Sequence, residues 1–209
     1  MNRGLQSIKL WVRSGMKQLA VMLNRVSGGR ITPDGITWFG FAMHIPIALL
    51  IANGDFIWAA VGLVVFGLFD TLDGELARLQ KTASPGGMLL DASTDRMKEV
   101  LLYGGAAYYF AAEGFAPWVL AFAVIALGAS MSVSYVKAKG EAAVASGKKQ
   151  IDHHTLNRMF ADGLLTFEVR MALLVIGLLT GQLQWVVVII AAGATFTAFQ
   201  RLFTISRSL

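Results

Sequence analysis

The sequence predicts an all-α integral membrane protein with six transmembrane helices and an amphipathic interfacial helix at its N-terminus. Composition is the first reason, since 56% of the 209 residues are hydrophobic and only 15% are charged. The second reason is a succession of apolar stretches of about 20 residues, the length that crosses a bilayer. The third is that Lys and Arg gather in alternate loops between these stretches. A chain of this length is predicted to form a single domain, 1–209.

The charge balance and the cysteine content narrow the classes of partner and chemistry. The formal net charge is +5, and the basic residues stand beside apolar stretches. This pattern favours a membrane surface over nucleic acid as the partner. The chain has no cysteine, which excludes a disulfide framework and a thiol nucleophile or ligand. No cleavable signal peptide is expected, because Lys and Arg repeatedly interrupt the first apolar stretch.

The N-terminal part, 1–35, is predicted to be an interfacial helix followed by a glycine-rich loop. Within 1–28, apolar residues recur at helical spacing and basic residues fall between them. Such a helix suits the headgroup region, where Lys and Arg meet anionic lipid. A helix packed on the protein's own cytosolic face is the alternative.

The rest of the domain, 36–209, is predicted to be the transmembrane bundle. Its six predicted spans are 36–53, 56–78, 87–112, 118–138, 166–180 and 184–203. We expect His44, inside the first span, to have a hydrogen-bonded packing role and not to relay protons. The polar segment 140–163 is expected to be a solvated connection. Its adjacent His153 and His154 are not expected to bind a metal, because neighbouring residues on a helix do not share a face.

The distribution of basic residues also predicts orientation. Positive charge gathers before the first span, between the second and third, between the fourth and fifth, and after the sixth. By the positive-inside rule both termini are cytoplasmic, which suggests the inner (plasma) membrane. The polar loop between the second and third spans then also faces the cytoplasm.

Four aspartates stand beside that loop, close to long apolar stretches: Asp70, Asp73, Asp91 and Asp95. An unpaired carboxylate near hydrocarbon costs roughly 2.5–3.5 kcal/mol on insertion scales, so a bound cation is the simplest partner. The spacings of three and four residues put each pair on one helical face. Two facing helices would therefore direct all four carboxylates at one point. Such an all-oxygen set suits Mg²⁺ or Mn²⁺, and four carboxylates are enough for two ions.

The same stretch carries a motif that resembles a known family. It matches D-x2-D-G-x2-A-R-x8-G-x3-D-x3-D at every fixed position from Asp70 to Asp95, which is the signature of the CDP-alcohol phosphotransferases. The resemblance implies transfer of a phosphatidyl group from a CDP-linked lipid to an alcohol, with release of CMP. It further implies that Asp70, Asp73 and Asp91 hold the metal ions. Asp95 is implied to be the general base and to contact the second ion.

The resemblance also implies a nucleotide site around the motif. Gly74 would leave room for the nucleotide to approach the backbone, and Arg78 suits paired hydrogen bonds with phosphate. The other residues implied at this site are Asp34, Ala77, Ser84 and Gly87.

A second resemblance concerns the acceptor. The segment from Ser134 is similar to one in the prokaryotic phosphatidylinositol-phosphate synthases, which resemble most of this chain. In that group equivalent residues bind the acceptor's phosphate, which implies the same role for Ser134, Lys137, Arg170 and Arg201. Three cations in one pocket fit a phosphorylated polyol, with inositol phosphate as the expected acceptor. That group often has another arginine where this chain has Phe167, so glycerol 3-phosphate is the close rival.

Glu99 could bind acceptor hydroxyls or hold Lys98 or Arg96, and a structural role is favoured. The family commonly dimerises through its spans, which implies a homodimer.

An ion or proton transporter is the remote alternative, because intramembrane acids often mark ion pathways. Such a pathway would distribute acids across the membrane, whereas here they cluster at one end. A structural scaffold would leave the four acids unexplained.

Overall fold

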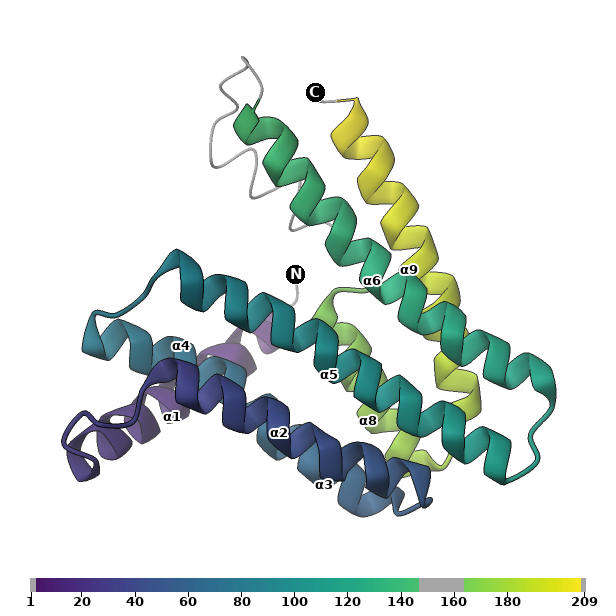
Figure 1. Ribbon diagram of the computed structural model, residues 1–209, viewed down its shortest axis with the longest axis horizontal. Helices are drawn as coiled ribbons and strands as arrows, with labels where there is room; N and C mark the ends of the chain where they lie inside the picture. Colours follow the sequence, from purple (N-terminus) through teal and green to yellow (C-terminus); the bar gives the residue numbers. More distant parts are fainter. Residues whose placement is uncertain (1–2, 147–163, 208–209) are drawn as a thin grey trace.

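The structure is a computed structural model that describes residues 3–146 and 164–207, and every element in these two ranges is an α-helix (Figure 1). The helices are α1 (Arg3–Val26), α2 (Pro33–Ala52), α3 (Phe56–Gly67), α4 (Phe69–Gln80), α5 (Pro85–Ala112), α6 (Pro117–Ser146), α8 (Phe167–Thr180) and α9 (Leu183–Ser206). The predicted fold class is therefore confirmed as all-α. His153 and His154 lie outside the described residues.

Four stretches are long and apolar enough to cross a membrane: Pro33–Ala52, Phe56–Gln80, Pro117–Val144 and Leu183–Ser206. They point to a membrane-embedded protein. Helix α5 does not meet the same criterion because its first half is rich in charged residues. Helix α8 has only 14 residues, fewer than the roughly 20 that span a bilayer. The number of six spans stays a prediction.

Two boundaries differ from the sequence-based prediction. The second predicted span is not one regular helix, because α3 ends at Gly67 and α4 begins after Leu68. The Leu68 N–H donates to Val65 O, three residues back, which tightens the last turn. The fourth span was predicted to end at 138, but α6 continues to Ser146. The residues after Gly140 include Glu and several Ala, which are strong helix formers and prolong the helix.

The helices pack in pairs around an apolar core. Helix α2 lies on α5, and α6 lies side by side with α9 (Figure 1). The short helix α8 packs against α3 and α9. The main core cluster joins α2, α3, α5, α6, α8 and α9 and is lined by buried aliphatic residues with Tyr103 and Phe110. This packing fixes α5 against α2 and thereby fixes where the motif's second half stands.

Gly105 makes the contact between α2 and α5 possible, and we predict that Gly105→Ala destabilises the protein. A Cβ at Gly105 would overlap the carbonyl oxygen of Ala48, which belongs to helix backbone and cannot turn away. Overpacking of this kind costs typically about 1–3 kcal/mol. The matched control is Gly104→Ala on the same helix, where a Cβ meets nothing within 4 Å. In detergent, the unfolding temperature of Gly105→Ala should be lower than that of the wild type, and that of Gly104→Ala should not. Equal unfolding temperatures for the two variants would contradict the prediction.

His44 supports the predicted packing role. The side chain is buried on α2, and its Nδ1 lies 2.7 Å from Gly40 O in the preceding turn. A histidine satisfied by its own helix needs no proton pathway to explain its presence.

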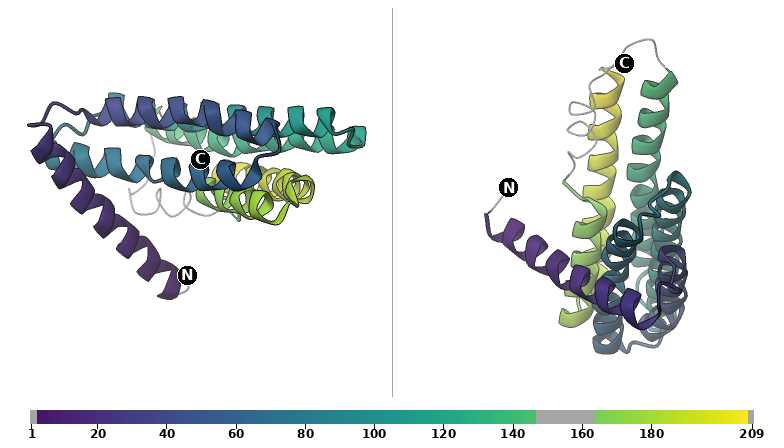
Figure 2. Two further views of the ribbon diagram at one scale, coloured as in Figure 1. Left: turned by 90° about the horizontal axis from the view of Figure 1, so that it is seen from below. Right: turned by 90° about the vertical axis from the view of Figure 1, so that its left-hand side faces the viewer.

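Helix α1 runs obliquely to the other helices in both views of Figure 2. Its inner face packs on α4, where Ala20 joins a small apolar cluster with Leu72 and Leu76. The Arg13 Nε donates to Glu75 Oε1 at 2.7 Å and stabilises the contact between α1 and α4. Its outer face leaves Leu10 and Trp11 exposed. One face of α1 thus packs on the protein, and the other presents apolar side chains outward.

Candidate active site

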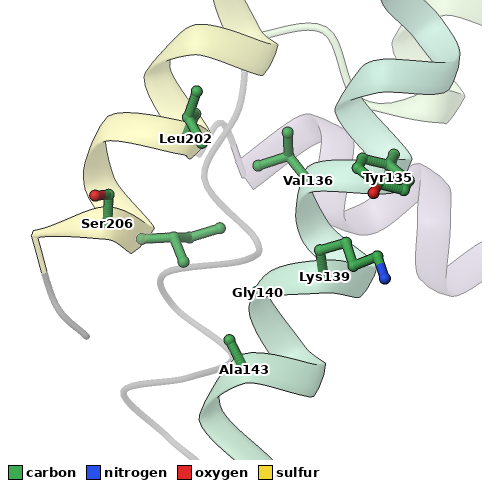
Figure 3. Close-up of a pocket in the computed structure, with 8 residues that line it drawn as sticks. Tyr135, Val136, Lys139, Gly140, Ala143, Leu202 and Ser206 are labelled. Carbon is green, nitrogen blue, oxygen red and sulfur yellow. The ribbon is translucent and has the colours of Figure 1, made fainter.

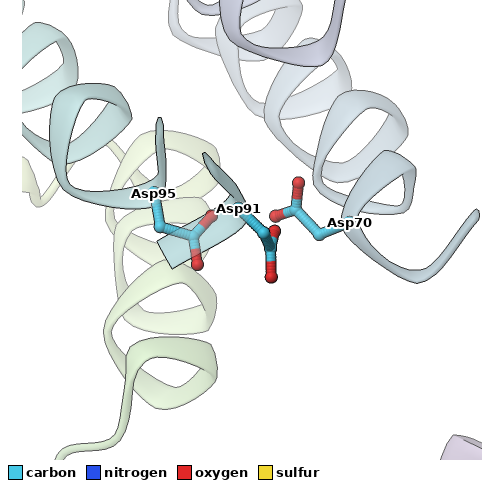
Figure 4. Close-up of side chains that lie close together, drawn as sticks. All are labelled: Asp70, Asp91 and Asp95. Carbon is cyan, nitrogen blue, oxygen red and sulfur yellow. The ribbon is translucent and has the colours of Figure 1, made fainter. Parts of the chain in front are cut away.

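Three of the four motif aspartates converge between α4 and α5. Asp70 lies in the first turn of α4, and Asp91 and Asp95 follow one another on α5. Figure 4 shows their carboxyl groups pointing toward one another across the gap between the two helices. One oxygen from each lies within 4.8 Å of one oxygen from each of the others. The facing-helix geometry predicted from the motif therefore brings Asp70, Asp91 and Asp95 together.

Asp73 stands apart from this cluster. It is buried one turn further along α4, and its Oδ2 accepts a hydrogen bond of 2.5 Å from Thr37 Oγ1 of α2. Its carboxylate remains close enough to Asp70 and Asp91 to interact with both electrostatically. No contact of Thr37 with the motif was predicted, because nothing in the sequence around Thr37 indicates a partner on another helix.

A lysine that sequence reasoning did not assign to the site lies inside the aspartate cluster. The Lys98 side chain is 1% exposed, and its Nζ donates to Asp70 Oδ1 at 2.5 Å and to Asp95 Oδ1 at 3.1 Å. It follows Asp95 by three residues on α5, so the two side chains share a face. In the sequence, this i, i+3 spacing was the feature that could have indicated the pairing of Lys98 with Asp95. The ammonium therefore joins the two helices through their carboxylates.

The donor set fits a hard divalent cation. Carboxylate oxygens are the ligands that Mg²⁺ and Mn²⁺ prefer. Among the described residues, Asp91 Oδ1 is a buried oxygen with no hydrogen-bond partner. A buried acceptor without a partner is costly unless a ligand satisfies it. The cluster also carries more negative charge than Lys98 alone can neutralise.

Three residues predicted for the nucleotide site gather at the start of α5. Ser84 caps this helix, and its Oγ accepts a hydrogen bond of 3.1 Å from the Gly87 N–H. A Cβ added to Gly87 would lie 3.7 Å from Asp34 Oδ1, which places the start of α2 next to it. A Cβ added to Gly74 would meet only Arg78 Nη2 within 4 Å, so the helix surface there is open to a ligand.

The predicted phosphate ligand Arg78 is held by an acid. Its Nη2 donates to Glu75 Oε1 at 2.7 Å, the same oxygen that accepts from Arg13 of α1. The Arg78 side chain is about half exposed, and Ala77 beside it is partly exposed. Glu75 therefore orients the guanidinium on the open side of α4, a role that the motif itself did not indicate.

The predicted acceptor residues are brought together in part. Ser134 Oγ on α6 accepts a hydrogen bond of 2.8 Å from Arg96 Nη1, and Arg96 lies next to Asp95 on α5. Arg201 on α9 is buried, and its Nη1 donates at 3.2 Å to the carbonyl of Val133, the neighbour of Ser134. Lys137 lies further along α6, half exposed, with its Nζ 3.8 Å from Glu141 Oε1. The structure thus places Arg201 beside the turn of α6 that carries Ser134, whereas Lys137 pairs with Glu141.

Arg170 belongs to the same group through Glu99. Glu99 is fully buried; its Oε1 accepts from Arg170 Nε at 2.8 Å and its Oε2 from Arg96 Nη1 at 2.7 Å. Of the two cations considered as partners of Glu99, the structure shows Arg96, whereas Lys98 donates to Asp70 and Asp95. The bond from Arg170 to Glu99 was not predicted. The Arg170 Nη2 is buried with no partner among the described residues. The Phe167 ring lies 4.8 Å below the Arg96 guanidinium carbon.

A separate hollow of about 370 Å³ lies between α6 and α9 (Figure 3). Its lining is mainly apolar, with Lys139 at one side and Leu202 at the other. None of the residues predicted for the metal, nucleotide or acceptor sites lines it, so it is not the predicted active site.

The chain is similar to proteins of known activity. It is 34% identical over 187 residues to a phosphatidylinositol phosphate synthase of Corynebacterium glutamicum, covering 86% of this chain and 80% of the relative. A crystal structure of Mycobacterium tuberculosis phosphatidylinositol phosphate synthase (PgsA1) with CDP-DAG bound superposes with a TM-score of 0.76 at 26% identity, over 91% of this chain and 92% of that chain. The same enzyme in complex with manganese and citrate superposes with a TM-score of 0.76, over 91% and 88%.

The family assignment rests on most of the chain. Residues 30–197 match the family model for CDP-alcohol phosphatidyltransferase, which includes every motif position and both helices of the aspartate cluster. The chain is therefore a transferase that belongs to the CDP-alcohol phosphatidyltransferase family.

Proposed function

We propose that the protein transfers the phosphatidyl group of CDP-diacylglycerol to a hydroxyl group of inositol phosphate and releases CMP, as a step in phospholipid biosynthesis. The observation that carries the proposal is the convergence of the Asp70, Asp91 and Asp95 carboxylates within the family motif. Two relatives support the substrates: one is named a phosphatidylinositol phosphate synthase, and the structure of another has CDP-DAG bound.

Mg²⁺ or Mn²⁺ is the proposed cofactor, with two ions in the reacting complex. Asp70, Asp91 and Asp95 would hold the metal, and the nearby Asp73 would complete the set. A relative has been crystallised with manganese, which supports the choice of ions. Bound divalent ions neutralise the negative charge that builds on the phosphates during transfer.

The protein's own groups account for the remaining steps. Asp95 would accept the proton of the acceptor hydroxyl as that oxygen attacks the β-phosphorus. The new O–P bond forms while the bond from phosphorus to the CMP oxygen breaks, and CMP leaves with the electron pair. Lys98 and Arg96 flank Asp95 at 3.1 Å and 3.7 Å and hold its carboxylate in place. The nucleotide would lie over Gly74 and Ala77, with Arg78 on its phosphates and Asp34, Ser84 and Gly87 beside it.

The acceptor's phosphate would bind among Ser134, Lys137, Arg170 and Arg201. Arg96 links this group to Asp95, because it donates to Ser134 Oγ at 2.8 Å and lies 3.7 Å from Asp95 Oδ2. An acceptor bound in the group would therefore have a hydroxyl near the proposed base. Phe167 stands where the prokaryotic phosphatidylinositol-phosphate synthases often have a further arginine. This pocket would therefore offer one cation fewer to the acceptor's phosphate and favour a smaller phosphate ester. Glycerol 3-phosphate is therefore the alternative acceptor.

The proposed setting is the plasma membrane, with six spans, both termini and the active site on the cytoplasmic side. Helix α1 would lie in the headgroup region with Leu10 and Trp11 toward the acyl chains. A homodimer formed through the spans is proposed from the family resemblance.

An acceptor panel with purified protein tests the proposal. CDP-diacylglycerol and Mn²⁺ are supplied with inositol 1-phosphate, glycerol 3-phosphate, serine or free inositol, and CMP release is measured. We predict the fastest release with inositol 1-phosphate, and the loss of release after exhaustive chelation with recovery on adding Mn²⁺ or Mg²⁺. Fastest release with glycerol 3-phosphate would reassign the acceptor. Unchanged turnover after chelation, or no CMP with any acceptor, would overturn the reaction itself.

A further inference from the structure

The position of Lys98 is unusual for a residue beside a metal site. A lysine side chain is rarely buried unless it is paired, and this one is 1% exposed with its Nζ between two carboxylates of the proposed metal site. The two carboxylates belong to different helices, Asp70 to α4 and Asp95 to α5. The ammonium thus already stands where a shared cation would join the helices.

The hydrogen bonds of Lys98 use the oxygens that a second ion would need. Two-ion sites place their ions about 3.5–4 Å apart and depend on carboxylates that both ions share. Here Asp70 Oδ1 and Asp95 Oδ1 both accept from Lys98. Asp91 is left out of this arrangement, and its buried Oδ1 has no hydrogen-bond partner within 3–146 and 164–207. The cluster is therefore divided into a side that Lys98 fills and a side, at Asp91, that still needs a ligand.

Charge balance gives the same division. Asp70, Asp91 and Asp95 carry three negative charges, of which the ammonium cancels one; Arg96 lies 3.7 Å from Asp95 but is paired with Glu99 at 2.7 Å. One divalent ion neutralises the remaining two. With Asp73 included, a single excess negative charge is left, too little for another divalent ion. The donor's pyrophosphate would bring the additional negative charge that a second ion requires.

We propose that Lys98 occupies one of the two cation positions of the nucleotide-free enzyme, so that the free site binds one divalent ion, on the Asp91 side. This inference rests on the proposed function, because it concerns the same metal site. It makes Lys98 a positioning residue that sets how many ions bind before the donor does. The second ion would enter together with the pyrophosphate.

Metal stoichiometry in the absence of nucleotide tests this. The full chain in detergent is titrated with Mn²⁺ alone, bound Mn²⁺ is counted by equilibrium dialysis, and electron paramagnetic resonance distinguishes a single ion from an exchange-coupled pair. We expect one ion and an uncoupled signal for the wild type and for Lys98→Arg, which keeps the charge. Lys98→Met, which keeps the length and removes the charge, should bind two ions and give the coupled signal. Lys139→Met, at an exposed lysine on α6, is the matched control and should behave as the wild type.

The outcomes separate this inference from the function on which it rests. Two ions in the nucleotide-free wild type would overturn the role of Lys98 and leave the metal-dependent reaction intact. A single ion in a folded Lys98→Met variant would overturn it too. No bound ion in any variant would overturn the metal site and, with it, both proposals. If Lys98→Met fails to fold, the stoichiometry of the wild type still decides.

Discussion

Replacing Asp95 by asparagine should reduce CMP release by roughly 10²–10⁴-fold, the usual contribution of a positioned general base. The amide cannot take the proton of the acceptor hydroxyl and is a poorer ligand for a divalent ion. Its oxygen can still accept the hydrogen bond that Lys98 Nζ makes to Asp95 Oδ1 at 3.1 Å, so the packing of α5 is retained. The measurement is CMP release at saturating CDP-diacylglycerol and acceptor, with the unfolding temperature recorded in parallel.

The matched control for this substitution is Asp55→Asn. Asp55 is exposed in the connection before α3 and makes no side-chain capping bond there. It should release CMP at the wild-type rate. Near-normal release by the Asp95→Asn variant, with an unchanged unfolding temperature, would remove Asp95 from the proposed chemistry and leave the acceptor proton to another group.

The prediction that all four aspartates meet at one point holds for Asp70, Asp91 and Asp95, whose geometry is local, and not for Asp73, which is bonded to Thr37. Asp91 and Asp95 share a face through the i, i+4 spacing alone, and Asp70 needs only a facing helix to meet them. The all-α class followed equally directly from the long apolar stretches. Helix ends were predicted less well, because helix formers such as Ala and Glu carry α6 past the apolar stretch to Ser146.

The partners of the cluster could not be predicted, because they depend on how distant helices pack. Thr37 contacts Asp73 only because α2 packs against α4, and the local sequence around each residue does not indicate the other as its partner. Arg170 was expected at the acceptor's phosphate, yet its Nε donates a hydrogen bond to Glu99, 71 residues earlier in the chain. Lys98 had a visible i, i+3 neighbour in Asp95, but its second bond, to Asp70, again requires the tertiary contact.

Replacing Glu99 by glutamine should destabilise the protein by about 3–5 kcal/mol, the cost of removing one partner of a buried ion pair. Glu99 is fully buried and its two oxygens accept from Arg96 at 2.7 Å and from Arg170 at 2.8 Å. A neutral amide removes the counter-charge that the two guanidinium groups share between α5 and α8 and leaves Arg96 with Asp95 at 3.7 Å. Thermal and denaturant unfolding in detergent measure the change.

A matched control and a compensating variant make this prediction specific. Glu141→Gln removes a carboxylate from an exposed pair, whose Nζ–Oε1 distance to Lys137 is 3.8 Å, and should change stability by about 0–1 kcal/mol. Combining Glu99→Met with Arg170→Met removes a buried charge of each sign, so it should recover part of the loss that Glu99→Gln suffers. Arg96 keeps its bond to Ser134 Oγ at 2.8 Å but loses its bond to Glu99, which limits the recovery to a part. Wild-type stability in Glu99→Gln would mean that water solvates both arginines or another acid neutralises them, and that Glu99 does not hold α5, α6 and α8 together.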